Sequence, residues 1–405
     1  MAKLSNKKRP WSRWPLYAYL CSLSLLSIRW ESLGESVLGS VFSISRIVSP
    51  ILVLCAIFDY KNCFTVIDKR VILLLIFITL GVFWDFVFIP YYRISFIDSV
   101  KPFLWVSIFT IILNLTRCPK IKKNCISCLA ISGLLFSLFQ FLNLSVRKVD
   151  LVAKGGLGLA YERGAGAGAD ANFATIFLGV SIMAAAFIFF DKRNGYFLKI
   201  IAVFTAMICF AAAYQLVSRG GLFAVLAGLC SIGICLKGAV SKILGFTFLL
   251  ICLAGLVWIL AQNEFLVYRM QASYYDSDTS GRGAIWLLAL DVCAQAKYMF
   301  FGAGFFNGMI ELGSRMGRPY FSPHNSYIWA LQSTGIVGFG LAAMIISGII
   351  FSAVKNRFNG NEGFFNIGCL TIMLVGSLGI DLHITIVFWV VFAMASNVEY
   401  KLRNE

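Results

Sequence analysis

His324 is the residue whose chemistry and position are most informative. It is one of two histidines in the chain and lies in Ser-Pro-His-Asn-Ser-Tyr, where a long polar loop ends and an apolar segment begins. An unperturbed imidazole has a pKa of about 6.5, so it exchanges protons near neutral pH. The position predicts a general base or acid beside a membrane, and therefore an enzyme. The other histidine, His383, follows Asp381 in a short turn, and we expect those two side chains to pair structurally.

Two arginines have the chemistry to hold an anion near His324. Arg219 lies in Ser-Arg-Gly-Gly between two apolar runs, and Arg282 follows a polar turn and opens a run with helical potential. A guanidinium suits phosphate because its planar fork makes two charge-assisted hydrogen bonds. Alternatively, Arg219 extends to lipid headgroups, and Arg282 is a solvated first-turn residue paired with Asp276 or Asp278. We predict that both arginines act in catalysis together with His324.

Five further polar residues are candidates for substrate binding. Lys154 and Arg163 lie in one polar loop, and Arg318 lies in the longest one. Asn325 follows His324, and Asn172 lies at the start of an apolar segment. Capping of a helix is the alternative interpretation for Asn172. Cations grouped on one face predict a negatively charged ligand.

The composition identifies the environment in which these residues act. Of 405 residues, 59% are hydrophobic and only 13% are charged, which excludes a soluble globular protein. Apolar runs of near-spanning length predict an all-α polytopic membrane protein with about twelve transmembrane helices. These runs lie near residues 15–29, 37–58, 71–89, 99–115, 125–143, 171–190, 198–217, 220–236, 243–262, 334–354, 364–380 and 384–398.

Basic residues recur at alternate connections, as the positive-inside rule requires. This pattern predicts that both termini are cytoplasmic and that the loops 144–170 and 263–323 lie outside. We therefore expect a region 1–262 with nine helices, a long outer loop 263–323 with short helices, and a region 324–405 that begins with His324 and Asn325 and holds the last three helices.

The remaining composition excludes several functions. The net charge of +16 is largely the cytoplasmic bias of a membrane protein, so nucleic acid is not an expected partner. Nearly all twelve cysteines lie in helices or at cytoplasmic ends, so no outer disulfide is expected. The chain lacks HExxH, a nucleophile elbow and a phosphate-binding GxxxxGK[ST] motif, which weakens the case for protease, hydrolase or ATPase activity.

The order of these elements resembles the bacterial O-antigen ligase family, which includes lipid A-core ligases and O-antigen and exopolysaccharide polymerases. The resemblance covers roughly residues 170–340. It consists of Ser-Arg-Gly-Gly at an outer helix junction, a long loop with Gly-Arg and Gly-Ala-Gly-Phe, and Pro-His-Asn before Gly-Ile-Val-Gly. The family's diphosphate-binding arginine then falls on Arg219, its loop arginine on Arg282 and its histidine on His324, whereas Arg163 and Asn172 match more loosely.

The resemblance implies a GT-C-like glycosyltransferase of the bacterial inner membrane. Such an enzyme transfers a glycan from undecaprenyl diphosphate to an acceptor sugar on the periplasmic face and needs neither a metal nor another cofactor. The acceptor is lipid A-core for an O-antigen ligase in lipopolysaccharide biosynthesis, or a lipid-linked repeat unit for a polymerase. A polysaccharide transporter is a more remote alternative, because we find no clear internal repeat and few charges in the middle of the predicted helices.

Overall fold

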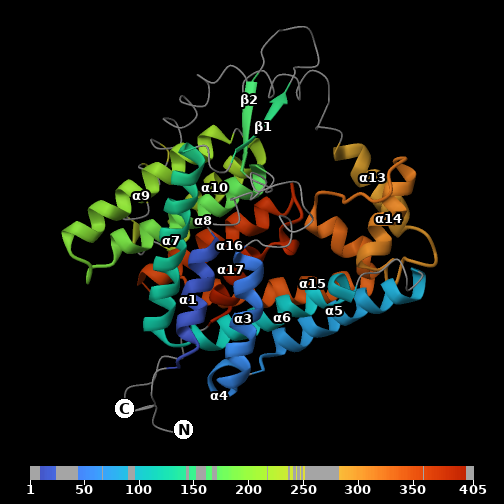
Figure 1. Ribbon diagram of the computed structural model, residues 1–405, viewed down its shortest axis with the longest axis horizontal. Helices are drawn as coiled ribbons and strands as arrows, with labels where there is room; N and C mark the ends of the chain where they lie inside the picture. The colour runs from blue at the N-terminus through green and yellow to red at the C-terminus, as the bar shows by residue number, and fades with distance from the viewer. Residues whose placement is uncertain are drawn as a thin grey trace.

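Long apolar segments form the helices of the computed structural model (Figure 1), which describes residues 10–23, 44–65, 67–89, 96–142, 146–151, 161–166, 171–216, 218–235, 282–358 and 360–397, with isolated positions between 238 and 250. Within these ranges, five helices are long and apolar enough to cross a membrane. They are α5 (Lys69–Phe88), α7 (Pro119–Phe141), α8 (Ala171–Phe190), α9 (Tyr196–Gln215) and α15 (Ser326–Lys355).

The other described helices do not belong to these five. Apolar segments form α3 (Ile44–Phe58), α6 (Phe96–Leu115), α10 (Arg219–Ser231), α16 (Gly360–Gly376) and α17 (Ile386–Ser396). The remaining helices are α1 (Arg13–Ser22), α4 (Tyr60–Cys63), α13 (Arg282–Cys293), α14 (Phe305–Arg315) and the 3₁₀ segments η4 (Ile232–Cys235) and η5 (Leu382–Ile384). The predicted helix 243–262 falls almost entirely outside the described residues, so the count of about twelve stays a prediction.

One described part of the chain departs from the all-α prediction. In the expected outer loop, β1 (Val146–Leu151) and β2 (Tyr161–Gly166) form an antiparallel hairpin, in which Val149 lies opposite Arg163. The hairpin extends beyond the helices at the end of the bundle where α8 begins (Figure 1). Alternating glycines in β2 obscure the strand in the sequence because they provide no β-branched or aromatic pattern.

Helix α8 lies at the centre of the bundle and packs against α7, α9, α10 and α16. Small residues let these helices approach closely, as is typical of membrane proteins. A Cβ added to Gly133 of α7 would lie 2.2 Å from the Ser181 side chain of α8, and one on Gly228 of α10 would lie 2.3 Å from Ile372 of α16. The Ser181 hydroxyl also donates a 3.0 Å hydrogen bond to the Leu129 carbonyl across the α7–α8 contact.

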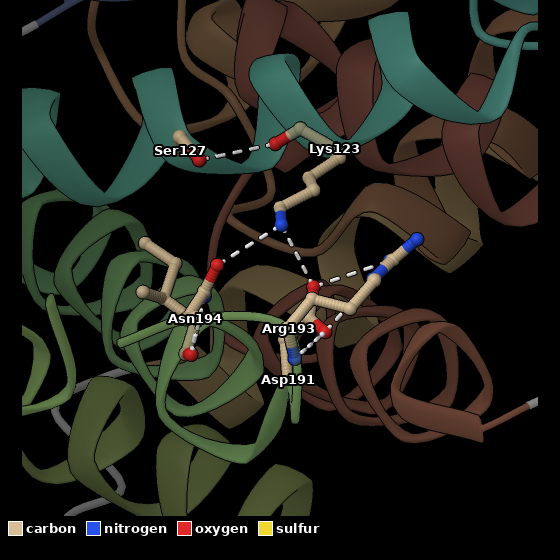
Figure 2. Close-up of polar contacts among 6 residues, drawn as sticks. Lys123, Ser127, Asp191, Arg193 and Asn194 are labelled. Carbon is tan, nitrogen blue, oxygen red and sulfur yellow. Dashed lines mark hydrogen bonds and ion pairs between the residues drawn. The ribbon is translucent and has the colours of Figure 1, made fainter. Parts of the chain in front are cut away.

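Charged side chains tie the helices together at the end of the bundle where α8 ends (Figure 2). Asp191 follows α8 and binds both Lys123 of α7, at 2.8 Å, and Arg193, at 3.0 Å. Lys123 also donates to the Asn194 side chain at 3.0 Å. Hydrogen bonds from the Arg193 guanidinium and ammonium of Lys123 outweigh burial and lower the pKa of Asp191. These contacts fix the turn between α8 and α9 against α7.

Helix α15 is broken at Gly335, which has φ +63°. The segment before α14 fills the break: Ala303 and Gly304 donate to the Gln332 and Ser333 carbonyls, and Met299 and Phe300 accept from residues 336 and 337. Asp85 of α5 then accepts from the backbone amides of Phe306 and Asn307, at 2.7 and 3.0 Å, and so caps α14. The glycine-rich Gly-Ala-Gly segment is therefore a fixed packing element that holds α13 and α14 beside α5 and α15 (Figure 1).

Candidate functional site

His324 has an unusual backbone conformation. Its φ of +53° is the only positive φ of a non-glycine residue in the described ranges. A left-handed residue of this kind costs of order 1–3 kcal/mol and persists where the surroundings determine it, often at functional sites. The side chain is 42% exposed, so the imidazole is open to a ligand.

The Asp381 carboxylate contacts one nitrogen of the His324 imidazole. Its Oδ2 lies 3.4 Å from His324 Nδ1 and also accepts a hydrogen bond from the Ser322 hydroxyl. The carboxylate side chain is only 9% exposed. Because Nδ1 faces a carboxylate, Nε2 is the ring nitrogen left to exchange a proton with a substrate.

The electrostatics of this pair keep Asp381 ionised at neutral pH. Burial raises the pKa of the Asp381 carboxyl, but the hydrogen bond from His324, the nearby His383 ring and the hydrogen bond from Ser322 together outweigh it, so that the pKa lies below its usual value. A carboxylate that accepts hydrogen bonds in its charged form behaves in this way. Asp381 therefore supplies a fixed negative charge beside the His324 ring.

Hydrogen bonds join the His324 segment to the turn after α16. The Asn325 side chain caps α15 by accepting from the amides of Tyr327 and Ile328, at 3.0 and 3.1 Å, and donates to the Leu378 carbonyl at 3.2 Å. The Ser326 amide donates to the Ser377 carbonyl at 2.9 Å. Asn325 is 5% exposed, and these contacts give it the part of a residue that positions His324; the predicted substrate contact stays a prediction.

Arg282 approaches the same turn from α13. As predicted, it occupies the first turn of its helix. A Cβ added to Gly379 would lie 3.2 Å from an Arg282 guanidinium nitrogen, so the arginine lies against the turn that carries Asp381. One helical turn later, Trp286 donates a 3.0 Å hydrogen bond to the Pro323 carbonyl, which precedes His324. Helix α13 thus positions both a cation and the backbone of the histidine.

Arg219 begins α10, at the same end of α8 as the hairpin. Ser218 caps α10 by accepting from the Gly221 amide at 3.0 Å, and its hydroxyl donates to Asn172 Oδ1 at 2.5 Å. A Cβ on Gly221 would lie 2.6 Å from Thr175, so the glycine allows α10 to begin directly against α8. Asn172 and Arg219 therefore lie at the junction where the first turn of α8 meets the first turn of α10.

Helix α8 connects this junction to the His324 turn. Ile176 follows Thr175 and would lie 2.4 Å from a Cβ on Gly376, at the end of α16. The Arg219 junction and the Asp381 turn thus both pack against the first turns of α8. Arg219, Arg282 and His324 are consequently gathered at one end of the bundle.

Two other cations of the long loop are neutralised by neighbouring acids. Arg315 of α14 pairs with Asp291 of α13, and Lys297, in the segment between the two helices, lies 3.7 Å from Glu311 of α14. Arg318 instead lies over the Phe321 ring at 5.0 Å. The Phe321 ring also contacts His324: the two ring centroids are 5.4 Å apart, and the rings are nearly perpendicular. Arg318 and His324 therefore contact the same aromatic ring, and the predicted role of Arg318 in substrate binding stays a prediction.

Other sequence predictions have different outcomes. Lys154 lies outside the described residues, and Arg163 is described only as a backbone position of β2. The predicted pairing of His383 with Asp381 is wrong, because His383 Nδ1 lies 3.2 Å from the Ser326 hydroxyl and Asp381 binds His324 instead. Asp381 is the functional candidate that sequence reasoning missed. Its signal was an acidic residue between two apolar segments on the same face as His324.

Residues 204–343 match the family model described as O-Antigen ligase, which confirms the predicted resemblance for this region. The matched region includes Arg219, Arg282 and His324, whereas Asp381 follows it. No curated protein matches the chain.

Proposed function

Because residues 204–343 form a region of the O-antigen ligase family, we propose that the protein transfers a glycan from undecaprenyl diphosphate to an acceptor sugar at the periplasmic face of the bacterial inner membrane. The preferred acceptor is lipid A-core, which makes the protein an O-antigen ligase of lipopolysaccharide biosynthesis. The observation that carries this proposal is the exposed His324, whose backbone is left-handed and whose Nδ1 lies 3.4 Å from the Asp381 carboxylate.

In the proposed reaction, His324 activates the acceptor. Its Nε2 removes the proton from an acceptor hydroxyl while that oxygen attacks the anomeric carbon of the donor. General base catalysis of this kind contributes about 10²–10⁴-fold to a rate. Asp381 stabilises the imidazolium that forms, because its charge lies 3.4 Å from Nδ1.

The leaving group requires positive charge. As the new bond forms, the bond from the anomeric carbon to the diphosphate oxygen breaks, and negative charge grows on the diphosphate. Arg282 lies against the Asp381 turn and Arg219 lies at the same end of α8, so we propose that they bind this diphosphate. Each is worth about 2–4 kcal/mol of transition-state stabilisation, by analogy with oxyanion donors. In this proposal the arginines provide the charge that a metal ion provides in other transferases.

Orientation in the membrane supports a periplasmic reaction. The basic cluster around Lys123 and Arg193 lies at the opposite end of α8 from Arg219, and basic ends favour the cytoplasm. The candidate site then faces the periplasm, where lipid-linked glycans and lipid A-core would meet, and both termini are proposed to be cytoplasmic.

A polymerase is the alternative within the same chemistry. It differs in using a lipid-linked repeat unit as acceptor, and the residues that bind diphosphate and activate a hydroxyl would be the same. Loss of function in cells separates the two activities. Without a ligase no polymer is joined to core, whereas without a polymerase core carries a single repeat unit.

The test is a lipopolysaccharide gel from a strain that lacks the gene and carries the wild type, His324→Ala or Arg282→Ala. Arg315→Ala is the matched control, because Arg315 is a paired arginine of the same loop. We expect the control to restore the wild-type pattern and both site variants to fail at equal membrane abundance. Normal banding with both site variants would refute the catalytic assignment.

A further inference from the structure

A cavity of about 270 Å³ lies in the helical bundle, beside the site described above but separate from its charged residues. It is enclosed by α5, α6, α15, α16 and α17, and apolar side chains make most of its wall. Three tryptophans line it: Trp105, Trp329 and Trp389. No charged aspartate, glutamate, lysine or arginine side chain is among its described lining residues.

Two residues that line the cavity carry polar atoms that lack partners among the described residues. They are His383 Nε2 and Ser377 Oγ, in side chains that are 6% and 1% exposed. Buried polar atoms are nearly always hydrogen-bonded, so two such atoms that line the same cavity indicate a missing partner.

The hydrogen-bond network defines which ring nitrogen of His383 carries the proton. The Ser326 hydroxyl has one proton, which it donates to the Ile380 carbonyl at 3.0 Å. It must therefore accept from His383 Nδ1, 3.2 Å away, which places the ring proton on Nδ1 and leaves Nε2 as a bare acceptor. Burial lowers the pKa of His383 to about 4, so the ring is neutral at neutral pH. The site therefore presents an acceptor at His383 and a hydroxyl at Ser377.

The opening of the cavity lies along the middle of α15. The exposed residues Phe339, Ala343 and Ser347 line it there. These positions are well inside a helix of 30 residues that is long and apolar enough to span a membrane. A ligand that enters at this depth comes from the bilayer rather than from water.

We propose that this cavity binds a neutral bilayer lipid that carries a hydroxyl group, with the hydroxyl donating to His383 Nε2 and accepting from Ser377 Oγ. The cavity is almost twice the size of the roughly 150 Å³ apolar cavity that binds benzene, so about ten carbon atoms of the lipid chain fit inside. A charged headgroup is excluded because the lining would leave the charge buried and unpaired. The ligand is therefore distinct from the anionic donor of the proposed reaction, and this inference does not rest on that function.

The test uses the full-length protein in phosphatidylcholine nanodiscs and the probe 10-bromodecan-1-ol. Bromine quenches tryptophan fluorescence on contact, and three tryptophans line the cavity. We expect saturable quenching by the alcohol, expressed per mole of lipid, at a concentration several-fold lower than for 1-bromodecane or 10-bromodecanoate. Equal quenching by all three probes would indicate partitioning alone and would overturn the proposal.

Two matched variants examine the polar end. Ser377→Ala should weaken binding of the alcohol by about 2- to 10-fold, the worth of one hydrogen bond, without affecting 1-bromodecane. Ser333→Ala is the control, because its hydroxyl is also buried without a described partner but does not line the cavity. Equal effects of the two serine variants on binding of the alcohol, or no effect of either, would mean that Ser377 makes no hydrogen bond to the alcohol. Either result would overturn the proposal.

A third variant examines the cavity itself. Ala342→Phe places a ring in the space that Ala342 now lines and should abolish the saturable quenching. Thermal unfolding of each variant provides the check on folding. Saturable quenching that survives in a folded Ala342→Phe protein would place the probe elsewhere and refute the site.

Discussion

Replacement of Asp381 by asparagine tests the central geometry of the candidate site. The change keeps the volume of the side chain but removes the negative charge 3.4 Å from His324 Nδ1. If His324 is the general base, the imidazolium formed in the transition state loses its stabilising partner. The amide also presents a donor in place of an acceptor, which favours the wrong tautomer of the imidazole.

The expected loss of rate follows from the contact. Two unit charges at this separation interact by about 5 kcal/mol at an effective dielectric constant near 20. Because His324 is 42% exposed, solvent screens much of that attraction. A hydrogen bond to a charged group contributes about 1.5–3 kcal/mol net, so we expect Asp381→Asn to lower the transfer rate by roughly 10- to 100-fold.

The assay is transfer of a lipid-linked glycan to an acceptor by the purified protein, measured with wild type, Asp381→Asn, His324→Ala and the double variant. A residue that acts through His324 has no further effect once the imidazole is absent. We therefore expect the double variant to be as slow as His324→Ala. An equal fractional loss from Asp381→Asn in both backgrounds, in folded proteins, would refute the pairing as a catalytic device.

Three other outcomes are expected. Arg282→Lys should slow transfer at least tenfold because lysine lacks the planar fork, whereas Arg315→Lys should have little effect in the same transfer assay. Asp191→Asn should lower the midpoint of thermal unfolding at pH 7. The stabilisation by Asp191 is fully present above the ordinary carboxyl pKa and is lost as the pH falls through the lowered pKa of the folded state. The difference in unfolding midpoint between the wild type and the variant should therefore shrink in acid. Gly304→Ala should destabilise by at least about 1–3 kcal/mol because φ is +92° and the new Cβ would lie 2.4 Å from the carboxylate that caps α14. Gly195→Ala, where a Cβ meets nothing within 4 Å, is its control, and equal thermal unfolding of the two would contradict the packing argument.

Much of the helical architecture could be predicted from hydropathy. The predicted run 171–190 coincides with α8, and the predicted run 198–217 lies within two residues of α9. Hydropathy placed the last long helix at 334–354, however, whereas α15 begins at Ser326. Its first turns include polar residues such as Gln332 and Ser333 and end at a break at Gly335, and the backbone pairing with residues 299–304 makes that break stable.

The candidate site, too, could be predicted only in part from the sequence. The sequence indicated Arg219, Arg282 and His324 because the chain has only two histidines and because the positive-inside pattern does not account for cations on the predicted outer face. It placed Arg282 correctly in the first turn of its helix. It could not pair His324 with Asp381, since 57 residues separate them and both histidines were equally available to the carboxylate by residue type.

The sequence by itself determined that this chain is a membrane protein, because transfer of apolar segments into a bilayer depends on composition and length. Its match to the O-antigen ligase family is likewise a property of sequence. Tertiary structure alone decided which histidine received the carboxylate, which arginines were already neutralised by acids, and where two buried polar atoms line an apolar cavity. These outcomes depend on distances of a few ångströms between segments far apart in the chain, and they are set by packing of small residues and by satisfaction of buried hydrogen bonds.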